Sequence, residues 1–378
     1  MPINHNIVFV KNKLISIDTI LPILIELKKD HGYYSDVVVF DKLAHKAINE
    51  NIVIKDGIEY VGREIFITNG IQNKFFRRIY LIKNLFLIFI KSVFGANLLH
   101  FGALDQHPLK IFGILFKKNV YRFPGSGYNF QYPKYSKYHG NKPKNFKKVG
   151  DNCVMFGSTS DFCDDTKFSY NFVPPRSRKV WVDYIRERSN LYFNKLHGDI
   201  KLKNGFFVIA TGPLLPTVRL PKLVDPINDC QRLFMETLNV LTRYSDKIPI
   251  LIKPHPLTDI ELLKKIIYKE NNMFITYLHP SILSLYARVF IANQFSNILA
   301  DAYTFGVDTI EYTNYNNNLL NITHGKSLEE QFVTYFINND YSQLEMVVSN
   351  IVACEHKVST YKGIFDNNSK LINKITRK

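Results

Sequence analysis

Short apolar segments alternate with longer amphipathic segments along the first third of this 378-residue chain. The apolar segments are rich in Val, Ile, Leu and Phe, and their length is typical of buried β-strands. Strands that are joined by helices pair in parallel, and the helices then cover both faces of the sheet. This stretch therefore predicts one α/β domain, whose strands are Ile7–Val10, Asp36–Phe40, Asn97–Phe101 and Val120–Phe123.

The same alternation starts again at Phe206, after a proline-containing passage at 173–178 and a helical stretch near 181–196. No GxGxxG run follows the first strand, which argues against a dinucleotide-binding fold. We predict an α/β fold with two Rossmann-like domains whose parallel sheets face each other across a cleft. The expected parts are residues 1–195, residues 200–350 and a C-terminal tail at 351–378, and the sequence predicts only helices from residue 329 onward. The predicted strands of the second domain are Phe206–Thr211, Ile248–Lys253, Phe274–Thr276, Val289–Ala292 and Thr309–Tyr312.

The most apolar segment of the chain is Ile79–Leu99, which Lys83, Asn84 and Lys91 interrupt. A membrane span needs about 20 mostly apolar residues. We therefore expect this segment to form a helix of the domain core, with a helix at a membrane interface as the alternative.

Two polar motifs follow predicted strands of the second domain. The first is Lys-Pro-His-Pro at 253–256, and the second is Asn-Gln-Phe-Ser-Asn at 293–297, where a helix is expected to begin at Ser296. Ligands of open α/β sheets bind at the carboxyl ends of the strands, and the N–H groups at a helix start suit a phosphate. Taken singly, each motif is more typical of a strand end or a helix cap without a ligand. Together they predict a nucleotide-phosphate site.

The His-Pro corner and the serine-containing turn resemble motifs of the bacterial GT-B glycosyltransferases that use CMP-activated sugars, namely the sialyltransferases, polysialyltransferases and Kdo transferases. The CDP-glycerol polymerases of teichoic acid synthesis are a more distant resemblance. The resemblance covers about Gly205–Asn314, and it implies that His255 and Ser296 contact the CMP phosphate and that Asp301 lies near the ribose. The donor is expected to approach the backbone closely at Gly212, unless this glycine serves a plain turn. The candidate nucleotide-binding residues are Gly212, Lys253, His255, Pro256, Asn293, Ser296, Asn297 and Asp301.

Two features depart from the sialyltransferase pattern. Asn297 replaces the second Ser or Thr, and the acidic-acidic-glycine motif is absent from the strand end at 122–127. These departures argue against an ordinary inverting sialyltransferase and leave transfer of Kdo or another nonulosonic acid more open.

Transfer from a CMP-sugar needs groups that take up the charge of the leaving phosphate and a carboxylate near the anomeric carbon. His255 fits the first role. An inverting reaction would use a base on the acceptor side, where Asp105 and Asp161 are expected, and a double displacement would use Asp225 or Asp229 on the donor side. Asp105 and Asp229 fit helix caps equally well. No cluster of His, Asp and Glu has the spacing of metal ligands, so we expect no catalytic metal and no cofactor besides the sugar donor.

The chain carries a net charge of +16 and has a pI near 9.4. This charge favours polyanionic partners, such as an anionic membrane surface, an acidic or lipid-linked glycan, or nucleic acid. The segment Tyr128–Gly150 interleaves lysines with tyrosines. Such a segment suits sugar acids as well as single-stranded nucleic acid, and a solvated loop is equally consistent with it.

The leading expectation is a cytoplasmic glycosyltransferase, since no signal peptide opens the chain. It would act at the inner face of the cytoplasmic membrane as a peripheral protein. It would move Kdo or a related nonulosonic acid from a CMP-sugar to a glycan or lipid-linked glycan of the capsule, lipopolysaccharide or O-antigen. One alternative is a CDP- or UDP-dependent transferase for polyol phosphate or hexose in surface polysaccharide synthesis. The other is a nucleic-acid-binding protein that uses residues 128–150. Two Rossmann-like domains with a phosphate corner favour the enzyme, so no nucleic-acid partner is expected.

Overall fold

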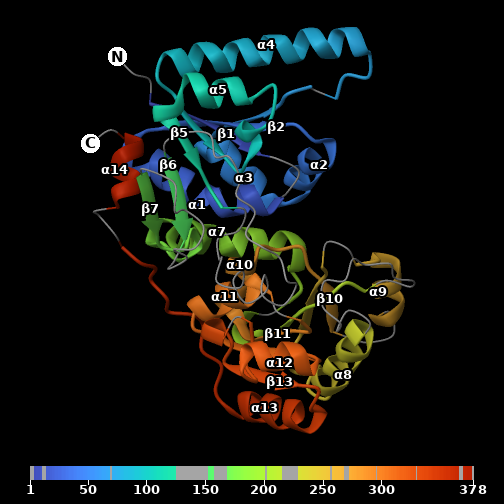
Figure 1. Cartoon of the computed structure of the whole chain (residues 1–378). Helices are drawn as coiled ribbons and strands as arrows, with labels where there is room; N and C mark the ends of the chain where they lie inside the picture. The colour runs from blue at the N-terminus through green and yellow to red at the C-terminus, as the bar shows by residue number, and fades with distance from the viewer. Residues whose placement is uncertain are drawn as a thin grey trace. The chain divides into compact units, whose positions relative to one another are not determined.

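The computed structural model of the chain describes residues 4–10, 14–68, 70–124, 152–156, 168–200, 202–214, 229–255, 258–267, 272–294, 296–328, 330–365 and 369–376. Asp161, Asp225, Pro256 and the segment Tyr128–Gly150 lie outside these described residues. The chain divides into two compact units. Unit 1 comprises Met1–Phe130, Lys144–Asp183 and Gly363–Lys378, and unit 2 comprises Gln131–Pro143 and Tyr184–Lys362. Each unit is an α/β unit with a parallel sheet, which confirms the predicted fold class (Figure 1).

Unit 1 contains a seven-stranded sheet with the order β3-β2-β1-β4-β5-β6-β7, in which every pair is parallel. The strands are β1 (His5–Val10), β2 (Tyr34–Val39), β3 (Gly62–Phe66), β4 (Asn97–His100), β5 (Val120–Arg122), β6 (Asn152–Phe156) and β7 (Phe168–Phe172). The central strand β1 is buried along almost its whole length, as expected for a parallel strand that helices cover on both faces.

The helices of unit 1 lie on the two faces of its sheet (Figure 1). Helices α1 (Leu14–His31), α2 (Lys42–Glu50) and α3 (Ile52–Val61) pack against one another. Helices α4 (Lys74–Val93) and α5 (Lys110–Leu115) cover the core that Ile7, Phe9 and Leu98 form on the other face.

The chain ends in unit 1, with helix α14 (Lys370–Thr376). The Asn97 side chain donates a hydrogen bond to the carbonyl of Ile375 at 3.2 Å. The Tyr121 hydroxyl donates another to the carbonyl of Lys374, also at 3.2 Å. These bonds attach the last helix to strands β4 and β5.

Unit 2 contains a six-stranded parallel sheet with the order β10-β9-β8-β11-β12-β13. Its strands are β8 (Phe206–Ala210), β9 (Ile250–Lys253), β10 (Met273–Ile275), β11 (Ala287–Ala292), β12 (Asp308–Thr313) and β13 (Tyr335–Asn338). Its helices are α7 (Lys179–His197, which begins in unit 1), α8 (Cys230–Thr242), α9 (Ile260–Ile267), α10 (Pro280–Tyr286), α11 (Asn297–Thr304), α12 (Asn317–Thr323) and α13 (Tyr341–Ala353). One core cluster joins the sheet to α8, α9 and α13 through Phe207, Leu233, Leu263 and Leu344.

Two expectations from the sequence are wrong. Helix α4 is not a core helix, because only Asn84, Ile88 and Ser92 of its residues are buried. Strand β13 interrupts the region that was predicted as helical. It is a four-residue edge strand with a single buried side chain, Ile337, so its apolar pattern is weak. Among the helices that the structure describes, none is long and apolar enough to cross a membrane.

Candidate functional site

The chain order of the strands reverses direction between β8 and β11 in unit 2. Strands β8, β9 and β10 follow one another toward one edge of the sheet, and β11, β12 and β13 follow one another toward the other edge. Such a switch point leaves a crevice at the carboxyl ends of the strands, and ligands of open α/β sheets bind there. The two predicted motifs follow β9 and β11, so both lie at this carboxyl edge, on either side of β8.

Hydrogen bonds of two threonines fix the corner that holds His255. The Thr211 hydroxyl accepts a hydrogen bond from the backbone N–H of His255 at 3.1 Å and lies 3.3 Å from the Thr258 hydroxyl. The Thr258 hydroxyl donates to the carbonyl of Gly212 at 3.2 Å. The ends of β8 and β9 are therefore joined, and the position of His255 follows from this joint.

His255 and Lys253 differ in charge at this corner. Burial lowers the pKa of the half-buried His255 below its ordinary value, so its imidazole is neutral near pH 7. The Lys253 ammonium donates a hydrogen bond to the carbonyl of Leu278 at 2.8 Å. The Lys253 side chain thus holds the loop between β10 and α10, while His255 offers a neutral ring.

The second motif starts helix α11 and is divided between surface and core. Ser296 is the N-cap residue, and its hydroxyl accepts a hydrogen bond from the N–H of Ile298 at 3.4 Å. Ser296 and Asn297 are half-buried at the strand-end edge, whereas the side chains of Asn293 and Asp301 are buried. The Asn293 amide donates to the hydroxyl of Thr237 in α8 at 2.9 Å. The structure therefore places Ser296 and Asn297 at the edge of the candidate site, and contact of a ligand with Asn293 or Asp301 stays a prediction.

Gly212 allows the start of α8 and the turn after β11 to pack against the end of β8. A Cβ atom at this position would lie 2.4 Å from Sγ of Cys230, the first residue of α8, and 3.6 Å from the side chain of Gln294. Burial, together with the neighbouring Asp229, raises the pKa of the Cys230 thiol to about 12, so this thiol is not a nucleophile. The glycine is thus required by the packing of α8 and of the turn after β11 against the end of β8.

The candidate carboxylates that the structure describes are both bonded to neighbouring side chains. Asp105 lies in the turn after β4, which forms the switch point of unit 1 with β1, and its Oδ2 is 3.1 Å from the Arg122 guanidinium. Asp229 accepts hydrogen bonds from Arg232, at 3.2 Å, and from Asn314. Asp105 and Asp229 belong to different units.

Of the comparisons with known proteins, the one with solved structures bears on the architecture. The sequence matches no protein-family model and no curated protein. The UDP-N-acetylglucosamine 2-epimerase from Rickettsia bellii is similar in structure, with a TM-score of 0.50 and 10% sequence identity over 99% of this chain and 94% of that chain. The fold is GT-B. The Arabidopsis thaliana UGT89C1 complexed with UDP gives a TM-score of 0.49 at 10% identity over 99% and 93% of the two chains. LpCGTa in complex with UDP gives a TM-score of 0.47 at 9% sequence identity, over 99% of this chain and 93% of that chain.

Two polar side chains of this GT-B chain were not predicted from the sequence. His100 ends β4 and is fully buried; its Nδ1 accepts hydrogen bonds from the N–H groups of Gly102, at 3.1 Å, and Leu104, at 3.3 Å. Burial, together with the Arg122 guanidinium, lowers the pKa of His100 to about 3. A neutral His100 therefore shapes the turn that carries Asp105. The sequence offers one signal for His100, which is a polar residue at the end of an apolar strand.

The second polar side chain that was not predicted from the sequence is Glu311, which lies in β12 and has no exposed surface. The Tyr315 hydroxyl donates to its Oε1 at 2.6 Å, and the Ser327 hydroxyl donates to its Oε2. Burial raises the pKa of Glu311 to about 7 in spite of these bonds. Residue 311 pairs in register with Ala292, the last residue of β11, so this titratable group lies beside the carboxyl end of that strand.

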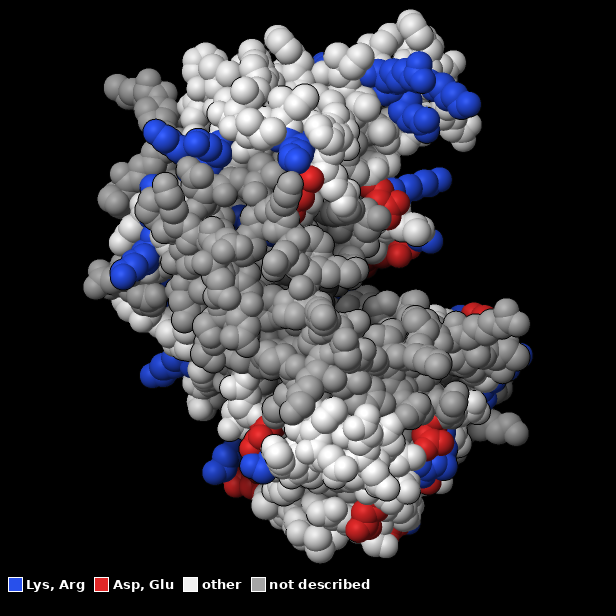
Figure 2. All heavy atoms as spheres, viewed as in Figure 1, with Lys and Arg blue, Asp and Glu red and all other residues white. Residues whose placement is uncertain are grey.

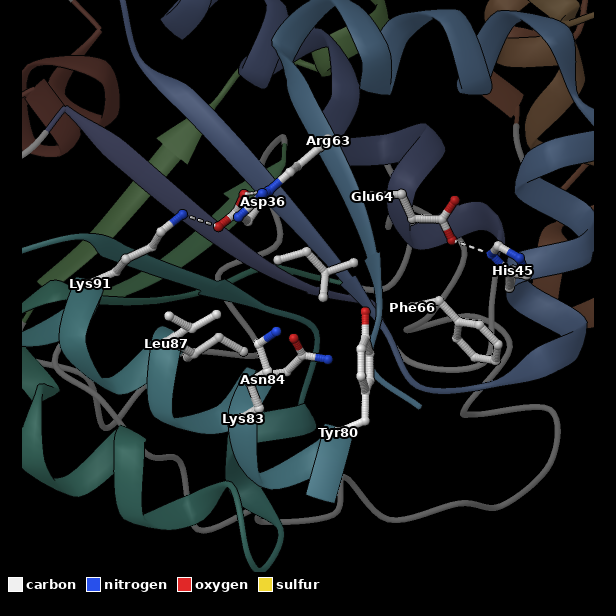
Figure 3. Close-up of a pocket in the computed structure, with 12 residues that line it drawn as sticks. Asp36, His45, Arg63, Glu64, Phe66, Tyr80, Lys83, Asn84, Leu87 and Lys91 are labelled. Atoms are coloured by element: carbon white, nitrogen blue, oxygen red, sulfur yellow. Dashed lines mark hydrogen bonds and ion pairs between the residues drawn. The ribbon is translucent and has the colours of Figure 1, made fainter. Parts of the chain in front are cut away.

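Unit 1 also contains a cavity of about 400 Å³ between β3 and α4 (Figure 3). Burial alone would raise the pKa of Asp36 in its wall, but hydrogen bonds from His5, Lys91 and Arg63 outweigh burial and hold this pKa well below its usual range. Glu64 is paired with His45 at 2.6 Å. The cavity lies along the edge strand, two strands from the switch point, and Asp105 does not line it. Its lining residues are Asp36, His45, Arg63, Glu64, Ile65, Phe66, Tyr80, Lys83, Asn84, Leu87, Ile88 and Lys91.

Within the described residues, no group of three or more His, Cys, Asp and Glu side chains is arranged to hold a metal ion.

Proposed function

We propose that this GT-B chain is a glycosyltransferase that takes its sugar from a pyrimidine-nucleotide donor. The observation that carries the proposal is the carboxyl edge of the unit 2 sheet. There, hydrogen bonds and close packing join the ends of β8, β9 and β11, and His255 and the start of α11 flank the end of β8. A nucleotide diphosphate or monophosphate fits such an edge, because helix-start N–H groups bind phosphate without a metal.

In this site hydrogen bonds would stabilise the leaving phosphate. Among the described residues, the N–H groups at the start of α11, the Ser296 hydroxyl and the neutral ring of His255 can donate them. Hydrogen-bond donors aimed at developing charge commonly make one of the main contributions to the rate of an enzyme reaction. Asp105 is the described candidate for the base on the acceptor side, and the Arg122 guanidinium lies 3.1 Å from its Oδ2.

Two donor classes are supported by different observations. The resemblance of the motifs at 253–256 and 293–297 supports a CMP-linked acidic sugar, such as Kdo or a related nonulosonic acid. A UDP-linked sugar is supported by the similar fold of an epimerase that is named for UDP-N-acetylglucosamine. In both cases we propose a glycan or lipid-linked glycan of the cell surface as the acceptor, and action at the inner face of the cytoplasmic membrane.

Calorimetric titration with CMP, CDP, UDP and GMP tests the proposal, with a mixed-sequence oligonucleotide as a further ligand. We expect one pyrimidine nucleotide to bind in preference to GMP, and the preferred one identifies the donor class. Binding of the oligonucleotide without binding of any nucleotide would overturn the proposal in favour of a nucleic-acid-binding protein.

The reaction is then followed by NMR with the preferred nucleotide-sugar, with and without acceptor glycans. Release of the nucleotide with loss of the sugar from the donor supports a transferase. Conversion of an intact UDP-sugar into its C2 epimer, without release of UDP, would instead identify an epimerase.

A further inference from the structure

Helix α4 presents an unusual outer surface. Thirteen of its 20 residues are exposed, and of these nine are apolar and four are Lys or Arg. Phe75, Ile82 and Phe86 are between 61% and 66% exposed. A water-facing helix normally carries polar residues of both charges on its outer face. Large exposed apolar patches on a folded protein mark interaction sites.

Helix α5 extends this surface. The ring of Phe89 in α4 lies 5.7 Å from the ring of Phe116 and 6.4 Å from that of Phe112, so the two helices are in contact. The exposed residues of α5 are Ile111, Ile114 and Leu115, all of which are apolar. We name the exposed residues of 74–94 and 110–118 the α4–α5 face.

The charge around the α4–α5 face has one sign. No Asp or Glu occurs between Ile65 and Leu104, and Asp105 is paired with Arg122. Residues 65–124 contain nine Lys and Arg and one Asp, so they carry 9 − 1 = 8 of the net charge of +16. Figure 2 shows Lys and Arg gathered at one end of α4, with no acidic side chain over the helix on the visible face.

A stripe of buried and half-buried residues attaches α4 to unit 1, and Leu81 and Leu85 in it pack against the core. The buried residues of the helix are Asn84, Ile88 and Ser92, and the Asn84 amide donates to the carbonyl of Ile67 at 3.1 Å. The outward orientation of the apolar residues is therefore fixed by this stripe.

We propose that the α4–α5 face docks onto an anionic lipid bilayer, with α4 lying in the plane of the interface. Apolar and aromatic side chains would enter the boundary between headgroups and acyl chains, and the cations would contact the anionic headgroups. A second copy of the chain fits less well. In a symmetric dimer the α4–α5 face of one copy would pack against the same face of the other copy. The cations of the two copies would then face each other without acidic partners. The inference does not depend on the proposed transferase activity.

Vesicle flotation with the full chain tests how much the apolar residues of the α4–α5 face contribute to membrane binding. Wild type is expected to bind vesicles of phosphatidylcholine mixed with phosphatidylglycerol, and to bind phosphatidylcholine alone weakly. The double variant Ile82→Asp with Phe86→Asp is expected to lose about tenfold or more in partitioning, because charges replace inserted apolar groups. The matched control is Leu191→Asp with Met346→Asp in unit 2, at sites 64% and 57% exposed, and it should partition as wild type.

The contribution of the cations to vesicle binding is tested with the double variant Arg77→Gln, Arg78→Gln. Each cation near an anionic surface contributes about 1 kcal/mol, so this pair should lower partitioning on the order of 30-fold. The control pair is Lys357→Gln with Lys362→Gln, which are exposed residues of unit 2. Binding should also weaken as salt is raised.

Insertion is measured directly in a Phe86→Trp variant with brominated lipids. The only native tryptophan, Trp181, is fully buried and serves as an unquenched background. Quenching of the fluorescence of the introduced indole supports docking. The proposal would be overturned if the wild-type protein did not bind anionic vesicles. It would also be overturned if the variants of the α4–α5 face and their controls bound these vesicles equally. A lipid-independent dimer that the Ile82→Asp, Phe86→Asp variant converts to a monomer would assign the face to a second copy.

Discussion

Replacing Glu311 with Gln is expected to stabilise unit 2 at alkaline pH and to change its stability little at pH 5. The wild-type carboxyl is fully buried, and burial raises its pKa to about 7 from the ordinary value of 4.5. The folded state therefore holds this proton more tightly than the unfolded chain does. The stabilisation is complete below pH 4.5 and is lost as the pH rises through 7.

The magnitude follows from the two pKa values. One pKa unit corresponds to about 1.36 kcal/mol, so the ionised carboxyl costs the folded state about 3 kcal/mol at pH 8 and less than about 1 kcal/mol at pH 5. Gln cannot ionise, and it can keep both hydrogen bonds. The Tyr315 hydroxyl can still donate to the amide oxygen, and the Ser327 hydroxyl can accept from the amide nitrogen.

Urea unfolding followed by far-UV circular dichroism, at intervals between pH 5 and pH 8.5, measures this difference. Other titrating groups cancel when the variant is compared with wild type at each pH. The control is Glu355→Gln at an exposed site of the same unit, which should change the free energy of unfolding by less than about 0.5 kcal/mol throughout. A Glu311→Gln variant that is less stable than wild type at pH 8, or a difference that does not vary with pH, would refute the reasoning.

Three further predictions concern the strand-end site. His255→Ala is expected to lower transfer turnover by about 10²–10³ without changing the melting temperature, because a donor to the leaving phosphate is lost; turnover at saturating donor checks this. Ser296→Ala should weaken nucleotide binding by about 1–2 kcal/mol in calorimetry, and unchanged affinity would leave Ser296 as a helix cap only. Gly212→Ala should destabilise unit 2 by about 1–3 kcal/mol, since the added Cβ would lie 2.4 Å from Cys230 Sγ. Adding Cys230→Ala should restore part of this loss in thermal unfolding.

The central strands of both sheets could be predicted because they are buried on both faces. Strand β8 is apolar along its whole length and β1 is apolar from Ile7 to Val10, which is the pattern that a helix-covered parallel strand requires. The edge strands β3 and β13 were missed for the opposite reason. Their residues are largely half-exposed, and polar side chains such as Arg63 and Glu64 hide their apolar pattern.

The position of the candidate site could also be predicted, because a motif that follows a parallel strand always lies at the carboxyl edge of the sheet. The partners of its side chains could not. Lys253 bonds to the carbonyl of Leu278, 25 residues away, and Asn293 bonds to Thr237, 56 residues away. Such contacts depend on how the loops and helices pack, and local sequence does not encode them.

Helix α4 shows a related limit. Its apolar residues are compatible with burial in a core or with exposure at an interface, and a count of apolar residues cannot separate the two. The three buried residues Asn84, Ile88 and Ser92 decide between them, and two of these are polar. The inward side of α4 also includes Leu81 and Leu85, which pack against the core. A core helix would bury its Phe and Ile residues as well, whereas most of those in α4 are exposed, as expected for a helix whose apolar face meets an outside partner.

The distribution of charge separates two kinds of binding in this chain. Among the described residues of the strand-end site of unit 2, His255 is neutral and the Lys253 ammonium is bonded to a backbone carbonyl, so the described groups that would hold a phosphate there are mainly N–H and O–H donors. The α4–α5 face of unit 1 combines apolar side chains with cations in a region that carries half of the net charge. Because exposed charges are screened by salt and buried hydrogen bonds are not, binding at the two places should respond differently to ionic strength. The basic character of residues 65–124 therefore argues for a lipid partner of the α4–α5 face.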